Sequence, residues 1–148
     1  MAGPLTIDAS VLLNAFNPAE PHHAESSRLM ARVRAEGLPL VAPTLALPEV
    51  AATIARTTGD PDTARGFAEQ LRILPGLILV PLDETLAIQA AEVASEHRLR
   101  GSDAVYGAVC LRFGCPLVTL DREQRERLSP IVRSDTPKET LVDLGEDA

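Results

Sequence analysis

The sequence predicts an α/β fold of three layers, α/β/α, in which a central, mostly parallel sheet of about five strands lies between helices. Short apolar runs of strand length alternate along the chain with longer segments of helical periodicity. The 148 residues, 45% of them hydrophobic, suffice for one buried core, and no low-complexity linker divides them. We therefore expect a single domain over residues 1–148.

Five short apolar runs are the candidates for the strands. They are rich in Leu, Val and Ile, and proline, glycine or charged residues bound them. Such runs favour parallel strands that helices bury on both faces, because neither side of the strand then needs polar residues. The runs span residues 5–8, 38–43, 77–82, 117–120 and 131–133.

The helical segments between these runs have recognisable start and stop residues. Thr44 and Ser102 are good N-cap residues, and Pro18 and Gly114 stand where helices are expected to end. The predicted helices run from near Ser10 to before Pro18, over residues 21–37, after Thr44, over 62–74, over 83–99, and from Ser102 to Gly114.

The charge balance is acidic, and the basic residues are almost all arginine. The formal net charge is −7, and Lys138 is the single lysine among 14 basic residues. An acidic domain is a poor non-specific binder of nucleic acid, which argues against a DNA-coating role. It is compatible with an enzyme whose acidic cluster holds divalent cations, because bound ions invert the local field.

Several other classes of site or segment are not recognisable in the sequence. Neither a secretory signal nor a membrane span is present, so we expect a soluble cytoplasmic protein without membrane association. Cys110 and Cys115 are too few for a disulfide framework and are expected to be small buried hydrophobes. His22 and His23 are adjacent, whereas a metal pair on a helix needs a spacing of three or four.

Acidic residues stand at the ends of the strand candidates or on the helices that follow them. Asp8 ends the first apolar run, and Asp121 directly follows the fourth. Asp103 comes after Ser102, in the first turn of a helix, where the helix dipole is expected to keep it ionised at neutral pH. Because the carboxyl ends of parallel strands meet at one edge of a sheet, these carboxylates are expected to converge there.

Glu49 is a charged residue on an otherwise apolar helical segment, and two interpretations of it remain open. It reaches solvent at the edge of the helix, or it leans over the sheet towards Asp8. In the second case a cluster of four carboxylates forms, and its repulsion would be removed by divalent cations. Oxygen ligands without Cys or His at ligand spacing favour Mg²⁺ or Mn²⁺ over zinc.

Four stretches of the sequence together resemble a PIN domain, and in particular the VapC-type toxin ribonucleases of bacterial and archaeal toxin–antitoxin pairs. They are IDASVLL at residues 7–13, LPEVAATIAR at 47–56, LRGSDAVYGAV at 99–109 and PLVTLD at 116–121. The resemblance covers nearly the whole chain and implies a three-layer PIN-like fold.

The resemblance also implies a site and a function. It implies a metal-dependent endoribonuclease that cleaves RNA phosphodiester bonds, forms a homodimer and is inhibited by a cognate antitoxin. In such proteins four acidic positions bind Mg²⁺ or Mn²⁺, and a hydroxyl-bearing residue assists near the fourth. The matching acidic positions are Asp8, Glu49, Asp103 and Asp121, with Thr119 and Ser10 as hydroxyl-bearing neighbours.

Within this predicted site Asp8 is expected to be the central ligand, because the first strand normally lies in the middle of the sheet. Asp103 and Asp121 would complete the site, while Glu49 binds metal directly, binds it through water, or acts on the nucleophile. For Thr119 and Ser10, orienting a ligand or water and serving in capping or strand packing remain equal alternatives.

Two other functions remain open. A phosphotransfer domain of the receiver or haloacid-dehalogenase-like type also carries aspartates at strand ends. Such chemistry normally needs a lysine near the phosphoryl group, whereas Lys138 lies in the C-terminal tail, and the haloacid type has a second aspartate where this chain has Ser10. The third alternative is a binding module that keeps the fold without activity.

Overall fold

The computed structural model describes residues 3–147, which form five short strands and eight helices. The strands are β1 (Thr6–Ile7), β2 (Leu40–Pro43), β3 (Leu77–Val80), β4 (Leu117–Val118) and β5 (Ser134–Asp135). The helices are α1 (Ala9–Phe16), α2 (His23–Glu36), α3 (Ala46–Thr58), α4 (Pro61–Arg72), α5 (Glu84–His97), α6 (Gly101–Phe113), α7 (Arg122–Leu128) and α8 (Pro137–Asp143).

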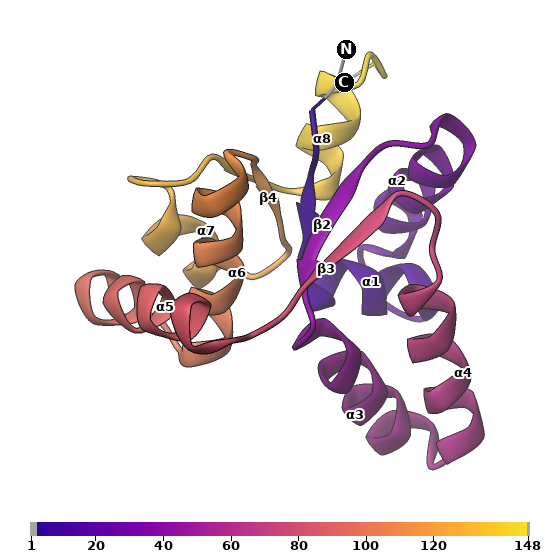
Figure 1. Ribbon diagram of the computed structural model, residues 1–148. Coiled ribbons are helices and arrows are strands. Elements are labelled where there is room, and N and C mark those ends of the chain that lie inside the picture. Colours follow the sequence, from indigo (N-terminus) through magenta and orange to yellow (C-terminus); the bar gives the residue numbers. More distant parts are fainter. Residues whose placement is uncertain (1–2, 148) are drawn as a thin grey trace.

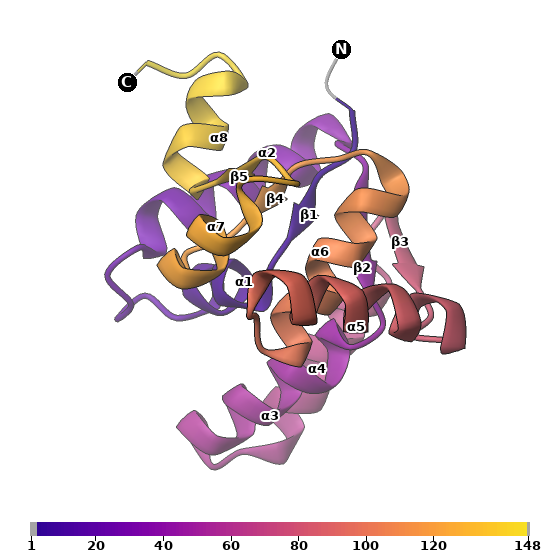
Figure 2. The ribbon, with the colours of Figure 1, turned by 90° about the vertical axis from the view of Figure 1, so that its left-hand side faces the viewer.

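All strand pairs are parallel, and the strands follow the order β3-β2-β1-β4-β5, which Figure 2 shows from one face. The link between β2 and β1 is a single bridge between Leu5 and Leu40. Two backbone hydrogen bonds support it, from Leu5 to Pro39 at 3.1 Å and from Val41 to Leu5 at 2.9 Å. The predicted parallel sheet is confirmed, with β1 at its centre.

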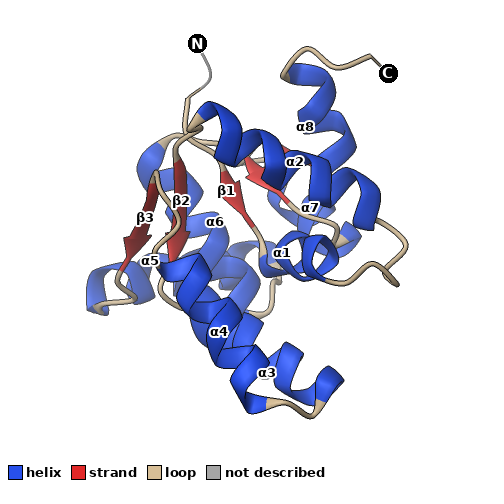
Figure 3. Ribbon diagram, turned by 90° about the vertical axis from the view of Figure 1, so that its right-hand side faces the viewer, coloured by secondary structure: helices blue, strands red, loops and turns tan. Residues whose placement is uncertain are grey.

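Helices cover both faces of the sheet, as the predicted three layers require. Helices α5, α6 and α7 lie on one face (Figure 2), and α1 and α2 lie on the other, where α8 packs against α2 (Figure 3). The α3–α4 hairpin leaves the carboxyl end of β2 and extends beyond the sheet (Figure 1). No helix within residues 3–147 is long and apolar enough to cross a bilayer.

Helix α6 is the most deeply buried element of the fold. Eight consecutive residues, 103–110, are buried, because α6 packs between the sheet and helix α5. Gly107 permits a close approach of α7, since a Cβ atom at this position would lie 2.7 Å from Cδ2 of the fully buried Leu128. The core therefore tolerates little added volume on this side of α6.

The last strand lies further along the chain than predicted. The run 131–133 is not a strand; β5 is formed by Ser134 and Asp135. The carbonyl of Leu128 accepts the amides of Ile131 and Val132, at 2.9 and 2.8 Å, so these residues form the turn that ends α7. Their apolar side chains made them resemble a strand, although only Val132 is buried.

Two predicted helix caps are also wrong. Helix α3 begins after Leu45 rather than at Thr44, whose hydroxyl instead accepts the amide of Leu82 at 3.3 Å. Helix α6 has Arg100 as its N-cap, so Ser102 lies inside the first turn. At Thr44 a tertiary hydrogen bond to Leu82 replaces the local cap, and α6 begins two residues earlier than the capping preference of Ser102 predicts.

Replacing Gly107 by valine is expected to lower the free energy of unfolding by about 2 kcal/mol, because the new side chain overpacks the contact with Leu128. Gly66 in α4 offers a matched control, since nothing lies within 4 Å of its Cβ position. Gly66→Val is expected to change stability by less than about 0.5 kcal/mol. Urea unfolding measures both variants, and equal losses would contradict the packing argument.

Candidate functional site

Asp8 lies at the carboxyl end of the central strand and is the N-cap of α1. Its Oδ2 accepts the amide of Ser10 at 3.0 Å, and its own amide donates to the carbonyl of Val118 at 2.9 Å. The residue is buried, with 7% of its surface exposed. Two strands and a helix start therefore fix the position of this carboxylate.

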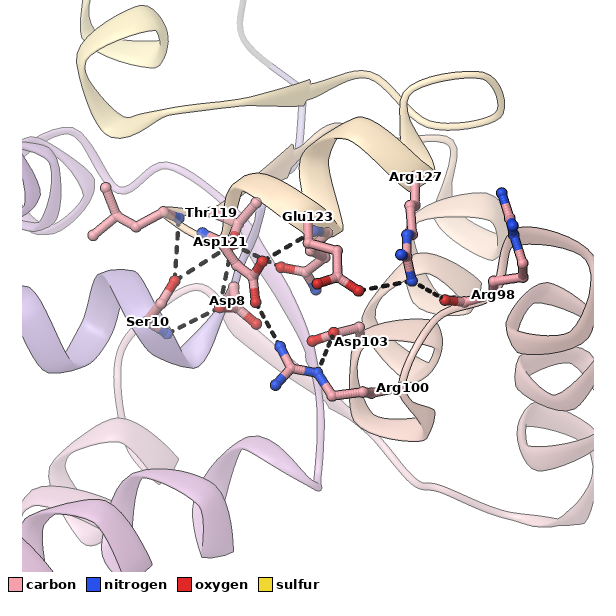
Figure 4. A network of polar contacts seen from close by, with 11 residues as sticks. Asp8, Ser10, Arg98, Arg100, Asp103, Thr119, Asp121, Glu123 and Arg127 are labelled. Carbon is pink, nitrogen blue, oxygen red and sulfur yellow. Dashed lines mark hydrogen bonds and ion pairs between the residues drawn. The ribbon is translucent and has the colours of Figure 1, made fainter.

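Thr119 and Ser10 connect Asp8 to the end of β4. The Thr119 hydroxyl lies 3.3 Å from Oδ2 of Asp8 and 2.7 Å from Oε1 of Gln124, and it accepts the amide of Asp121 at 3.1 Å. The Ser10 hydroxyl accepts the amide of Leu120 at 3.1 Å. The Thr119 hydroxyl thus contacts Asp8 and the backbone of Asp121, while the Ser10 hydroxyl holds the backbone of Leu120, and Figure 4 shows Ser10 and Thr119 close to Asp8.

Gln124 is a site residue that sequence reasoning missed. It is fully buried in α7, where its backbone amide donates to Oδ1 of Asp121 at 3.0 Å while its side chain contacts Thr119. Its Nε2 is buried without a hydrogen-bond partner among the described residues. A glutamine three residues after the aspartate that caps a helix was the available signal, but its side-chain contact depends on tertiary packing.

Arg100 bridges Asp103 and Asp121. Its Nε donates to Oδ2 of Asp103 at 3.1 Å, and its Nη2 donates to Oδ2 of Asp121 at 2.7 Å. Asp103 lies in the first turn of α6, and Asp121 is the N-cap of α7. One guanidinium therefore joins the two carboxylates across the gap between these helices (Figure 4).

Burial raises the pKa of Asp103 above its ordinary value. The hydrogen bond and charge of Arg100 oppose this shift, and the negative charges of Asp121 and Asp8 add to it. This direction is opposite to the one that the helix dipole alone predicts, because desolvation of the carboxylate is the larger effect.

Glu49 projects from the first turn of α3 and is half-buried. The hydroxyl of Tyr106 donates to its Oε1 at 2.8 Å. Burial raises the pKa of Glu49, the Tyr106 hydrogen bond opposes the shift, and the charges of Asp8 and Asp103 add to it. Of the two interpretations of this residue, the structure supports the one in which it faces the other acidic residues.

Tyr106 is a second residue whose role was missed. It is fully buried in α6, and burial together with the charges of Asp8 and Glu49 raises the pKa of its hydroxyl, which therefore stays protonated and acts as a donor. It is the single tyrosine of the sequence and lies one helical turn after Asp103, which was the signal available in the sequence.

The structure brings all six predicted site residues to one edge of the sheet, but not into a closed set of metal ligands. No three His, Cys, Asp or Glu side chains within residues 3–147 are arranged as a metal-binding group. Protein donors hold the carboxylates instead: Ser10 and Thr119 hold Asp8, Tyr106 holds Glu49, and Arg100 holds Asp103 and Asp121.

The donor chemistry nevertheless suits a hard divalent cation. All candidate ligands are oxygens, and a cationic group, Arg100, already binds between two of them. Cys110 and Cys115 are buried as predicted and contact Thr6 near the opposite end of β1 rather than this edge. The residues present therefore fit Mg²⁺ or Mn²⁺ better than a thiolate-bound metal, and the metal site itself stays a prediction.

Comparison with known proteins shows similarity to one family model and to several solved structures. The family model of the PIN domain matches residues 5–127. VapC20 of Mycobacterium tuberculosis, a sarcin-ricin loop cleaving toxin, has a similar structure, with a TM-score of 0.71, 20% identity, and coverage of 82% of this chain and 93% of that one. A search of curated proteins found no significant match.

Two toxin–antitoxin assemblies contain similar chains. VapBC2 of Rickettsia felis, solved with a DNA fragment from its promoter, gives a TM-score of 0.64 at 11% identity, covering 89% of this chain and 98% of that one. A toxin–antitoxin complex from Klebsiella pneumoniae gives 0.63 at 16% identity, covering 90% and 97%. At 11–20% sequence identity, the similarity to these structures is one of fold. The family model, in contrast, matches residues 5–127, and the chain therefore belongs to the PIN-domain family.

Proposed function

We propose that the protein is a metal-dependent endoribonuclease of the VapC toxin type. The observation that carries this proposal is the gathering of Asp8, Glu49, Asp103 and Asp121 from four separate segments at the carboxyl edge of β1 and β4. Parallel α/β sheets place their ligands at this edge. The sarcin-ricin loop cleavage by the structurally similar VapC20 supports RNA as the substrate class.

The acidic and hydroxyl-bearing residues of the site have different proposed roles. Asp8, Asp103 and Asp121 would hold Mg²⁺ or Mn²⁺, and the chemistry that such an ion would supply is activation of a water and stabilisation of the leaving oxygen. Glu49, held by the Tyr106 hydroxyl, would serve as a general base towards the attacking nucleophile. Thr119 and Ser10 keep Asp8 in position through the hydrogen bonds described above.

The phosphotransfer alternative gains no support from the site. The cation in contact with the acidic residues is Arg100, not a lysine, and the Ser10 hydroxyl binds the backbone of Leu120. The inactive binding module differs from the proposed nuclease in a measurable way, because it would lack a saturable Mn²⁺ site.

We also propose that the protein acts with a cognate antitoxin and forms a homodimer. The similar chains in the Rickettsia felis and Klebsiella pneumoniae assemblies support an antitoxin partner. The acidic edge supplies the physical reason, since arginine or lysine side chains of a partner would bind its carboxylates.

Asp8→Asn is expected to abolish Mn²⁺-dependent RNA cleavage while the fold persists, because asparagine remains a good N-cap but loses the charge that binds metal. Cleavage of labelled RNA measures the loss, and circular dichroism with thermal unfolding checks the fold. Asp60→Asn is the matched control, since Asp60 is likewise an N-cap but is exposed at the start of α4. Full activity of the Asp8→Asn protein would refute the proposed site.

The metal-free protein is expected to lose stability as pH rises, relative to an Asp103→Asn variant. The pKa of Asp103 is raised above 3.8 in the folded state, so folding favours the protonated carboxyl. The contribution of Asp103 to the free energy of unfolding is therefore fully present below pH 3.8 and is lost as pH rises through the higher pKa of the folded state.

Urea unfolding in EDTA between about pH 3 and pH 7 measures this difference. The stability of Asp103→Asn relative to the wild type is expected to increase from about pH 3 to about pH 7. In a separate measurement without EDTA, saturating Mn²⁺ is expected to stabilise the wild type but not Asp103→Asn. A difference that does not change with pH would contradict the pKa argument.

Expression of the protein alone is expected to arrest bacterial growth, and co-expression of an adjacent antitoxin gene is expected to restore it, because the antitoxin would cover the acidic edge. Growth curves after induction measure both effects, with the Asp8→Asn variant as the non-toxic control. Harmless expression of the active ribonuclease would argue against the toxin role while leaving the enzymatic proposal intact.

A further inference from the structure

Arg100 occupies an unusual place in the site, because one exposed side chain holds two of the acidic residues. Its side chain is 69% exposed, whereas those of Asp103 and Asp121 are 13% and 26% exposed. Arg100 is the N-cap of α6, but its side chain makes no capping hydrogen bond. The side chain therefore contributes contacts to the carboxylates and is not needed to start the helix.

The hydrogen bonds of Asp121 leave it little freedom to bind an ion while Arg100 is in place. Its Oδ1 accepts the amide of Gln124 at 3.0 Å, and its Oδ2 accepts Arg100 at 2.7 Å. An ion on the remaining lone pair of either oxygen would stand close to the guanidinium, and the two cations repel each other.

The cost of losing the two donors is unequal. The backbone amide of Gln124 belongs to a fully buried residue, so breaking its bond would leave a buried donor unsatisfied. The guanidinium of Arg100 can turn into solvent and bind water instead. Arg100 is therefore the group that an incoming ion displaces.

We propose that Arg100 is a built-in counter-cation that competes with the divalent ion for Asp103 and Asp121. In the absence of metal it compensates the two negative charges, and an ion that binds both carboxylates competes with these two contacts. This inference rests on the proposed function, because it takes Asp103 and Asp121 as metal ligands.

Other charged groups close to Arg100 and Asp121 have partners of their own. Glu123, whose charge also acts on Arg100, is paired with Arg127 at 2.7 Å. Arg122 directly follows Asp121, but it points to Glu126, which it contacts at 2.8 Å. Arg122 thus provides a cation next to the site that does not contact its carboxylates.

The test compares Mn²⁺ binding by the wild type, Arg100→Gln and Arg122→Gln, measured by isothermal titration calorimetry. Both variants lose one positive charge near Asp121, but only Arg100→Gln frees the carboxylates. The Kd of Arg100→Gln is expected to be roughly three- to tenfold lower than that of the wild type, and the Kd of Arg122→Gln is expected to be unchanged. Thermal unfolding verifies that both variants are folded.

A second measurement follows the guanidinium directly. On titration of the wild type with diamagnetic Mg²⁺, the ¹⁵Nε–H resonance of Arg100 is expected to move towards the position of a solvent-exposed arginine, while that of Arg122 stays in place. Saturable binding in the wild type that Arg100→Gln leaves unchanged or weakens would overturn the role of Arg100 alone. No saturable binding in either protein would overturn the proposed metal-dependent function as well.

Discussion

The pairing of β1 on both sides is the constraint on which the site depends. This strand has two residues, yet it bonds to β4 and, through Leu5, to β2, so it cannot shift without breaking the sheet. Asp8 is the next residue and is fixed both by the amide of Ser10 and by its own bond to Val118. The position of the carboxylate is therefore set by backbone pairing, and the other acidic residues are arranged around it.

The electrostatics of the site follow from burying several carboxylates together. Burial raises the pKa of Glu49 and Asp103, and the negative charges of neighbouring aspartates raise both pKa values further. Two hydrogen-bond donors oppose these shifts: the Tyr106 hydroxyl donates to Glu49, and the Arg100 guanidinium donates to Asp103. These two donors compensate part of the negative charge that burial of the carboxylates brings together.

Sequence reasoning reached the fold class and the edge at which the acidic residues meet, because both follow from the alternation of apolar runs and helices. It failed where a tertiary contact decides the outcome. The run 131–133 is apolar, but two of its amides bond to the carbonyl of Leu128 in a turn. Helix α6 has Arg100 rather than Ser102 at its N-cap position. The partners of Glu49 and Thr119, namely Tyr106 and Gln124, lie on helices whose packing no local pattern reveals.

Helix α6 serves both the core and the site, and this has a consequence for mutational scanning. Its residues 103–110 are all buried, and the same stretch contains Asp103 and Tyr106. For the proposed nuclease, a library scored only by growth or RNA cleavage would mark Gly107 and Asp103 alike as intolerant, although the first would fail by steric overlap and the second by loss of charge. Parallel scoring of protein abundance would separate these two causes and reveal which positions of α6 belong to the chemistry.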